Sequence, residues 1–210
     1  TKPWTIGLSV RGFYDDNYLL APRGSANIPE SFGFEVRPTV SLNVPLEQTY
    51  FGLDLTYSGK WFEDDDHWDQ SFLANALVNH SFTERINLEV RDRFTYTDQP
   101  QLVDTTLART DQSRITNLGD AQLSFGLSPR LGLVLAYQNL LVDYENENPT
   151  ADSVPPGTIG NPGSASLSAR LDRIEQTIPL NLRHQTGPST VTLIGYNYGM
   201  TDYTSKEFLY

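Results

Sequence analysis

Residues 41–65 read SLNVPLEQTYFGLDLTYSGKWFEDD, and this stretch predicts two antiparallel β-strands joined by a tight turn. Alternate side chains of a strand point to opposite sides of the backbone, so a period of two in hydropathy predicts a strand with one apolar side. The segment VPLEQ at 44–48 is the expected turn, and the acidic residues after position 62 begin a loop. The apolar side of the second strand carries Phe51, Leu53, Leu55, Tyr57 and Trp61.

The same alternation recurs along the chain, and we expect about nine strands in all. The windows are 4–14, 31–43, 50–61, 71–82, 86–96, 115–127, 131–142, 170–184 and 190–203. Asp92 and Asn117 stand on the apolar sides of their windows, and the apolar side of 190–203 cannot be chosen. Pro38 and Pro179 predict bulges or breaks in register, because proline has no N–H to donate to a ladder.

Short connections alternate with long ones. The short ones are 44–48, 83–85, 128–130 and 186–189, and the long ones are 15–30, 62–69, 97–113 and 143–165. In an antiparallel up-and-down meander, this alternation places every long loop at one end of the sheet and every tight turn at the other. A soluble sandwich has no need of such an asymmetry.

Composition narrows the classes of function. The chain has 210 residues, which we treat as one domain over 1–210, and it has no cysteine. Disulfides, cysteine-ligated metals and thiol nucleophiles are therefore ruled out. The net charge of −11 disfavours a nucleic-acid partner, because like charges repel.

Hydropathy excludes a membrane-spanning helix, which needs about 20 consecutive apolar residues, since the best run here is LGLVLA at 131–136. A spanning β-strand needs only about 10 residues with every second one apolar. In lipid no water can satisfy exposed backbone groups, so strands can span only as a closed ring that is apolar outside and polar inside. We therefore expect an all-β, antiparallel up-and-down transmembrane β-barrel.

The alternation, the loop asymmetry and the tract at 41–65 resemble bacterial outer-membrane β-barrel proteins over nearly the whole chain. The resemblance implies a location in the bacterial outer membrane, contact with its lipids, and a porin-like channel for passive diffusion of small solutes. A narrow, plugged barrel would instead be structural and act through its exposed loops. Such barrels have an even number of strands, so we expect the chain to be incomplete at its C-terminus. A homo-oligomer or a complex with another envelope protein stays open.

A second hypothesis is a soluble or surface-attached all-β module that binds a partner through its long loops. Alternation by itself does not distinguish lipid from a second protein layer packed on the apolar side. A covering sheet or helix over Phe34, Leu53 and Leu135 would exclude the barrel.

The barrel hypothesis assigns a role to each side of the strands. Charges of both signs would face the lumen, where they set selectivity or pair to fill a narrow bore. These charges are Arg11, Glu35, Arg37, Asp54, Lys60, Glu89, Arg91, Arg93, Arg173, Glu175 and Arg183. The expected lipid-facing residues are Phe32, Phe34, Val36, Phe51, Leu53, Leu55, Leu133 and Leu135. An interfacial aromatic girdle would comprise Trp4, Tyr14, Tyr57, Trp61, Tyr96 and Tyr137, although aromatic residues are also simply common in strands.

We expect no enzyme activity, metal or cofactor. His67, His80 and His184 lack the spacing of a catalytic metal site, and no GxSxG nucleophile motif is present. The acidic run at 63–66 lacks the spaced ligands of a calcium loop and is interpreted as a solvated loop. A membrane-embedded hydrolase is the weakest alternative.

Overall fold

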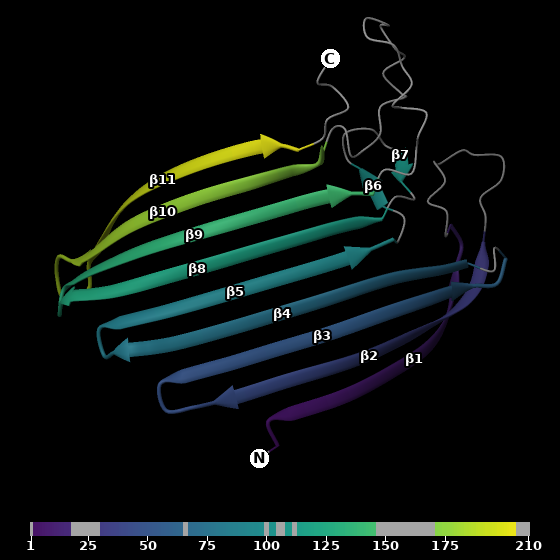
Figure 1. Cartoon of the computed structure of the whole chain (residues 1–210), viewed down its shortest axis with the longest axis horizontal. Coiled ribbons are helices and arrows are strands. Elements are labelled where there is room, and N and C mark those ends of the chain that lie inside the picture. Colours follow the sequence, from purple (N-terminus) through teal and green to yellow (C-terminus); the bar gives the residue numbers. More distant parts are fainter. Residues whose placement is uncertain are drawn as a thin grey trace, which may run out of the picture.

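Nine long antiparallel strands form one sheet in a computed structural model that describes residues 2–17, 30–64, 67–98, 101–103, 108–110, 113–145 and 171–204 (Figure 1). The strands of this sheet are β1 (Trp4–Asp15), β2 (Ser31–Pro45), β3 (Thr49–Phe62), β4 (His67–Thr83), β5 (Ile86–Thr97), β8 (Arg114–Ser128), β9 (Leu131–Tyr144), β10 (Arg173–Gln185) and β11 (Val191–Tyr203). Two short strands, β6 (Gln101–Val103) and β7 (Ala108–Thr110), pair only with each other. The prediction of an all-β up-and-down meander is confirmed.

The sheet is open. Its order is β1-β2-β3-β4-β5-β8-β9-β10-β11, so β1 and β11 are its two edges. Neither edge pairs with the other within the described part of the chain, and the expected closed ring is therefore not formed there. Every strand pairs antiparallel with its neighbour in the sheet, and the order of the strands in the sheet follows their order in the sequence. Tight turns and loops can make such connections, because antiparallel neighbours begin and end at the same edge.

Turns and loops separate to the two ends of the sheet, as the alternation in length predicts. The connections β2–β3, β4–β5, β8–β9 and β10–β11 lie at one end, and the remaining connections lie at the other (Figure 1). The prediction of a long loop over residues 62–69 is wrong. Strand β3 continues to Phe62, and β4 begins at His67 and pairs with the end of β3. Trp61 lies opposite Trp68 in this extended part of the ladder.

Pro38 and Pro179 do not shift the register. Val36 pairs with Gly59 and Thr39 with Thr56, so the ladder between β2 and β3 resumes in the same register after a gap at Pro38. The ladder between β9 and β10 likewise has a gap without a shift at Pro179. The expectation of bulges there is wrong: a missing N–H costs the local bridges only. The register shifts lie beside tight turns, at Ser81/Thr83 and Gly126/Ser128.

The strands are displaced along their length from β3 to β11, mainly between one hairpin and the next. One row of paired residues runs from Gly52 in β3 to Gly199 in β11 by way of Leu77, Arg91, Asp120, Gln138 and Thr177. Gly52 is the fourth residue of β3, whereas Gly199 is the ninth residue of β11, six strands further on. With a rise of about 3.3 Å per residue and a strand spacing of about 4.8 Å, this slide corresponds to a strand tilt of about 30°.

No second layer packs on this sheet within the described residues. All extensive contacts between elements join strands that are neighbours in a sheet. Four apolar residues of the described part are buried, Phe62, Ala136, Val142 and Tyr144, which is far too few for a conventional core. The described residues also contain no helix long and apolar enough to cross a membrane.

Candidate functional site

The ladder registers divide the strand side chains into two faces, because directly paired residues point to the same side of a sheet. All eleven charges expected to face a lumen fall on one face, which we call the polar face. All eight residues expected to face lipid, and all six of the expected girdle, fall on the other, which we call the apolar face. Both assignments follow from the registers alone.

The registers also decide the side of β11, which the sequence leaves open. Ile194 pairs with Leu182, and Tyr196 pairs with Leu180, so the even-numbered residues of β11 belong to the apolar face. Leu193 falls on the polar face, opposite Arg183.

Aromatic side chains of the apolar face gather toward the loop end of β2, β3 and β4. Phe34 packs on Trp61 with ring centroids 5.3 Å apart and on Trp68 at 5.4 Å. Sequence reasoning missed Trp68, because it falls inside the segment interpreted as a loop. Tyr137 departs from the expected girdle, because it is the seventh of the fourteen residues of β9.

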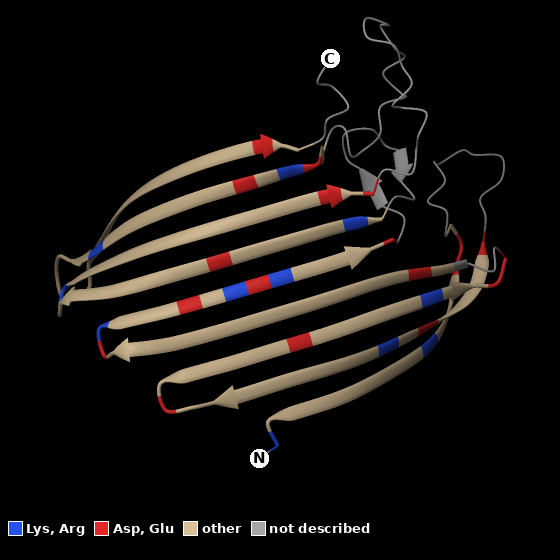
Figure 2. Cartoon of the chain, in the orientation of Figure 1, with Lys and Arg blue, Asp and Glu red and all other residues tan. Residues whose placement is uncertain are grey.

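The polar face is the shielded one. The four buried apolar residues all fall on it, as do the buried strand residues Ser31, Glu35, Ser58, Asp69 and Thr97. Most of the large apolar side chains that are exposed lie on the apolar face, whereas the edge strand β11 is exposed on both of its faces. Charged residues occur well inside the strands and not only near the loops, as the run in β5 shows (Figure 2).

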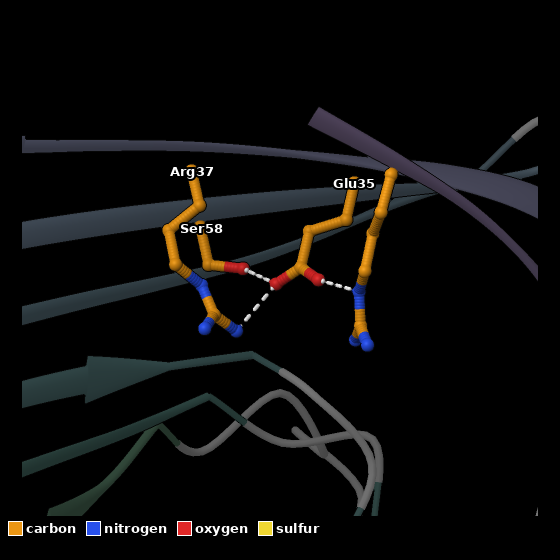
Figure 3. A network of polar contacts seen from close by, with 4 residues as sticks. Glu35, Arg37 and Ser58 are labelled. Atoms are coloured by element: carbon orange, nitrogen blue, oxygen red, sulfur yellow. Dashed lines mark hydrogen bonds and ion pairs between the residues drawn. The ribbon is translucent and has the colours of Figure 1, made fainter. Parts of the chain in front are cut away.

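Glu35 is the centre of a network that joins three strands on the polar face. Its side chain is 2% exposed and accepts hydrogen bonds from the Ser58 hydroxyl at 2.5 Å and from Arg37 Nη2 at 2.7 Å. Arg11 donates to the second carboxylate oxygen through Nε. Figure 3 shows Glu35, Arg37 and Ser58 pointing to the same side of the strands. Through Arg11, this network attaches the edge strand β1 to β2 and β3.

A hollow of about 500 Å³ lies on the polar face across β3, β4, β5, β8 and β9. Its acidic side chains are Asp54 and Asp120, and its basic side chains are Arg91 and Arg93. Its other lining residues are Tyr50, Gly52, Asn75, Ala76, Leu77, Leu118, Gln138 and Asp92, whose side chain belongs to the apolar face. Sequence reasoning found Asp54 and both arginines, but Asp120 and Gln138 join them only through the pairing of β5 with β8 and β9.

Hydrogen bonds hold several of these groups in place. Arg93 Nε donates to Asn75 Oδ1 at 3.0 Å, and Arg91 pairs with Glu89 at 2.7 Å. Gln138 donates to Asp120 at 3.3 Å. The hollow therefore presents both signs of charge, with Arg91 and Arg93 both exposed. Such an arrangement can hold hydrated ions or small polar solutes.

The remaining expected charges lie outside the hollow. Arg173 pairs with Glu175 at 2.5 Å near the loop end of β10, and Arg183 lies near the tight turn after β10. Lys60 lies directly opposite Glu35 in the ladder.

Potential metal ligands are dispersed over the described residues. No group of three or more potential metal ligands occurs among them. The His80 ring lies 2.7 Å from the Thr49 hydroxyl, and His184 lies 3.3 Å from that of Thr186, both beside tight turns. Asp65, Asp66 and the side chain of His67 lie outside the described part of the acidic run.

Comparisons with protein-family models, with curated proteins and with solved structures found no significant match.

Proposed function

We propose that this chain forms the wall of a transmembrane β-barrel of the bacterial outer-membrane type, and that its polar face lines a porin-like path for small solutes. The observation that carries the proposal is the apolar face, which no second layer of described residues covers. Leu8 is 70% exposed and Leu135 is 42% exposed, although both lie in the middle of apolar strand faces.

This exposure is costly in water. Burying one Leu, Val, Ile or Phe side chain is favourable by about 1.5–3 kcal/mol, and soluble monomers rarely expose large continuous apolar surfaces. A face of this kind requires a partner as wide as the sheet. Hydrocarbon is such a partner, and it also explains why the outward rows are apolar while the inward rows are mixed.

The strand slide supports closure into a barrel. Strands in a barrel tilt by about 35–45° to its axis, and the tilt arises from a steady slide in one direction from strand to strand. The net slide between β3 and β11 carries the paired row from the fourth to the ninth strand position, and its tilt of about 30° approaches that range.

The hollow supplies the proposed selectivity. Asp54 and Asp120 favour cations, whereas Arg91 and Arg93 favour anions, and side chains of both signs face the same space. Passage would be passive, down a concentration gradient, with no covalent step. Solutes would be sorted by size and by these fixed charges.

Paired substitutions at adjacent positions test the proposal, because Leu53 and Asp54 point to opposite faces. Leu53→Arg places a charge on the proposed lipid face and is expected to block insertion into bilayers, at a cost of up to about 2–4 kcal/mol. Asp54→Asn, the matched control, leaves insertion intact and changes conductance modestly. Insertion is measured by flotation with liposomes and resistance to urea extraction.

Two outcomes would overturn the proposal. Equal behaviour of the two variants would mean that the faces do not have different surroundings. Recovery of the wild-type chain as a stable monomer in aqueous buffer without detergent would favour the loop-binding soluble module instead.

A further inference from the structure

The apolar face has one polar row. Asp92 in β5, Gly119 in β8, Asn139 in β9 and Gln176 in β10 are consecutive partners in the ladders. Sequence reasoning singled out Asp92 as a misfit, and the registers show that it belongs to a row of four strands.

Apolar residues bound this row on both sides. The neighbouring row toward the tight turns contains Val90, Ala121 and Tyr137. The neighbouring row toward the loops contains Phe94, Leu141 and Ile174, together with Asn117. The polar row therefore lies inside the apolar surface and not at its border.

Hydrogen bonds within the chain satisfy only part of the row. Asn117 donates to both carboxylate oxygens of Asp92 at 3.0 Å, and Asn139 donates to the Tyr137 hydroxyl at 3.4 Å. A carboxylate has about four acceptor sites, so Asp92, which is exposed, can accept further bonds. The side chain of Gln176 makes no hydrogen bond within the described part of the chain. Facing hydrocarbon, these groups would be unsatisfied at high cost.

The order of groups along the row is complementary to itself. The acceptor Asp92 is at one end, and the donor amide of Gln176 is at the other, three strands away. When two copies of the row are laid face to face in opposite directions, each Asp92 meets a Gln176 and each Gly119 meets an Asn139. Gly119 has no side chain, and it therefore leaves space for the facing amide.

We propose that this polar row is the contact surface for a second copy of the chain, related by a two-fold axis that passes between β8 and β9. One part of this proposal rests on the proposed function: the free-energy cost of leaving the polar row uncovered arises only if the row faces lipid. The match between the Asp92 acceptor and the Gln176 donor does not depend on the membrane. Such an interface is isologous, because the same patch is used on both copies.

Cysteine cross-linking tests the position of the contact, since the chain has no cysteine of its own. Asn139→Cys places a thiol next to the proposed axis, whereas Leu8→Cys places one on the same face of β1, far from it. In liposomes at low protein density, a short bismaleimide is expected to give a covalent dimer with Asn139→Cys and none with Leu8→Cys. Equal yields from both variants would overturn the proposal.

An exchange of the end residues tests the pairing itself. Gln176→Asp opposes two carboxylates and is expected to raise the dimer dissociation constant about tenfold or more, measured by energy transfer between labelled copies in bilayers. The double variant Asp92→Gln with Gln176→Asp again places one amide opposite one carboxylate at each end of the row. Its dissociation constant is expected to return to near the wild-type value. Absence of this rescue would overturn the proposal.

Failure of this proposal and failure of the proposed function give different results. A wild-type chain that inserts into liposomes but remains monomeric overturns the two-fold contact and leaves the barrel wall intact. A chain that does not insert overturns the proposed function. The dimer dissociation constants of the wild type, the Gln176→Asp variant and the double variant are then compared in aqueous buffer, where absence of the rescue overturns the two-fold contact as well.

Discussion

Replacing Glu35 with Gln is expected to destabilise the sheet by about 2–3 kcal/mol, because it removes the charge that two arginines share. Glu35 is 2% exposed and accepts bonds from Arg11, Arg37 and Ser58. Hydrogen bonds to charged groups contribute about 1.5–3 kcal/mol each. The lower end of that range applies here, because the Arg11 and Arg37 side chains are 59% and 48% exposed and can recover water. In addition, the Gln amide nitrogen turns a donor toward one arginine.

The matched control is Glu89→Gln. Glu89 pairs with Arg91, whose side chain is 61% exposed, and such exposed pairs are worth at most about 1 kcal/mol. Both variants keep the shape of the side chain and remove one negative charge on the polar face. A difference between them therefore reports the burial of Glu35 and the strands that it joins.

The free energy of unfolding is measured in detergent micelles by urea titration with tryptophan emission as the signal. A loss of about 2–3 kcal/mol lowers the midpoint by about 0.7–3 M urea, if the slope is about 1–3 kcal/mol per molar. A loss for Glu35→Gln within about 0.5 kcal/mol of that for Glu89→Gln would refute the reasoning, since that is the usual effect of a surface change.

Two further predictions concern the faces of the sheet. The three tryptophans of the chain all lie on the apolar face, and they are Trp4, Trp61 and Trp68. Bromine labels on the acyl chains of a bilayer are therefore expected to quench the tryptophan emission of the wild-type protein strongly. Unchanged emission would contradict a lipid-facing apolar side. Arg93→Gln removes a positive charge from the hollow and is expected to shift the reversal potential in planar bilayers toward cation preference, whereas Arg130→Gln, in the tight turn after β8, is expected to keep the wild-type preference.

The nine strands of the main sheet, their order and most of their faces could be predicted from the sequence, because they depend on local alternation and on connection length. The short strands β6 and β7 were missed, because they lie in the segment interpreted as the long loop 97–113. Phe51, Leu53 and Leu55 identify their face without knowledge of any partner strand. The failures occurred where local signals are mixed or weak. Residues 62–69 look like a loop by composition, yet cross-strand pairing of Trp61 with Trp68 extends the strands through them. Pro38 looked like a bulge, yet pairing on both sides of it holds the register.

The alternation in the sequence by itself determined an antiparallel meander with one apolar and one polar face, since a strand displays its pattern residue by residue. Only the tertiary structure decided which side chains meet across strands. The burial of Glu35 between two arginines, the joining of Asp54 with Asp120 in one hollow, and the row that begins at Asp92 all depend on register. Register is a property of pairs of strands, because it is set by the summed fit of many side chains along two segments, and no single segment contains it.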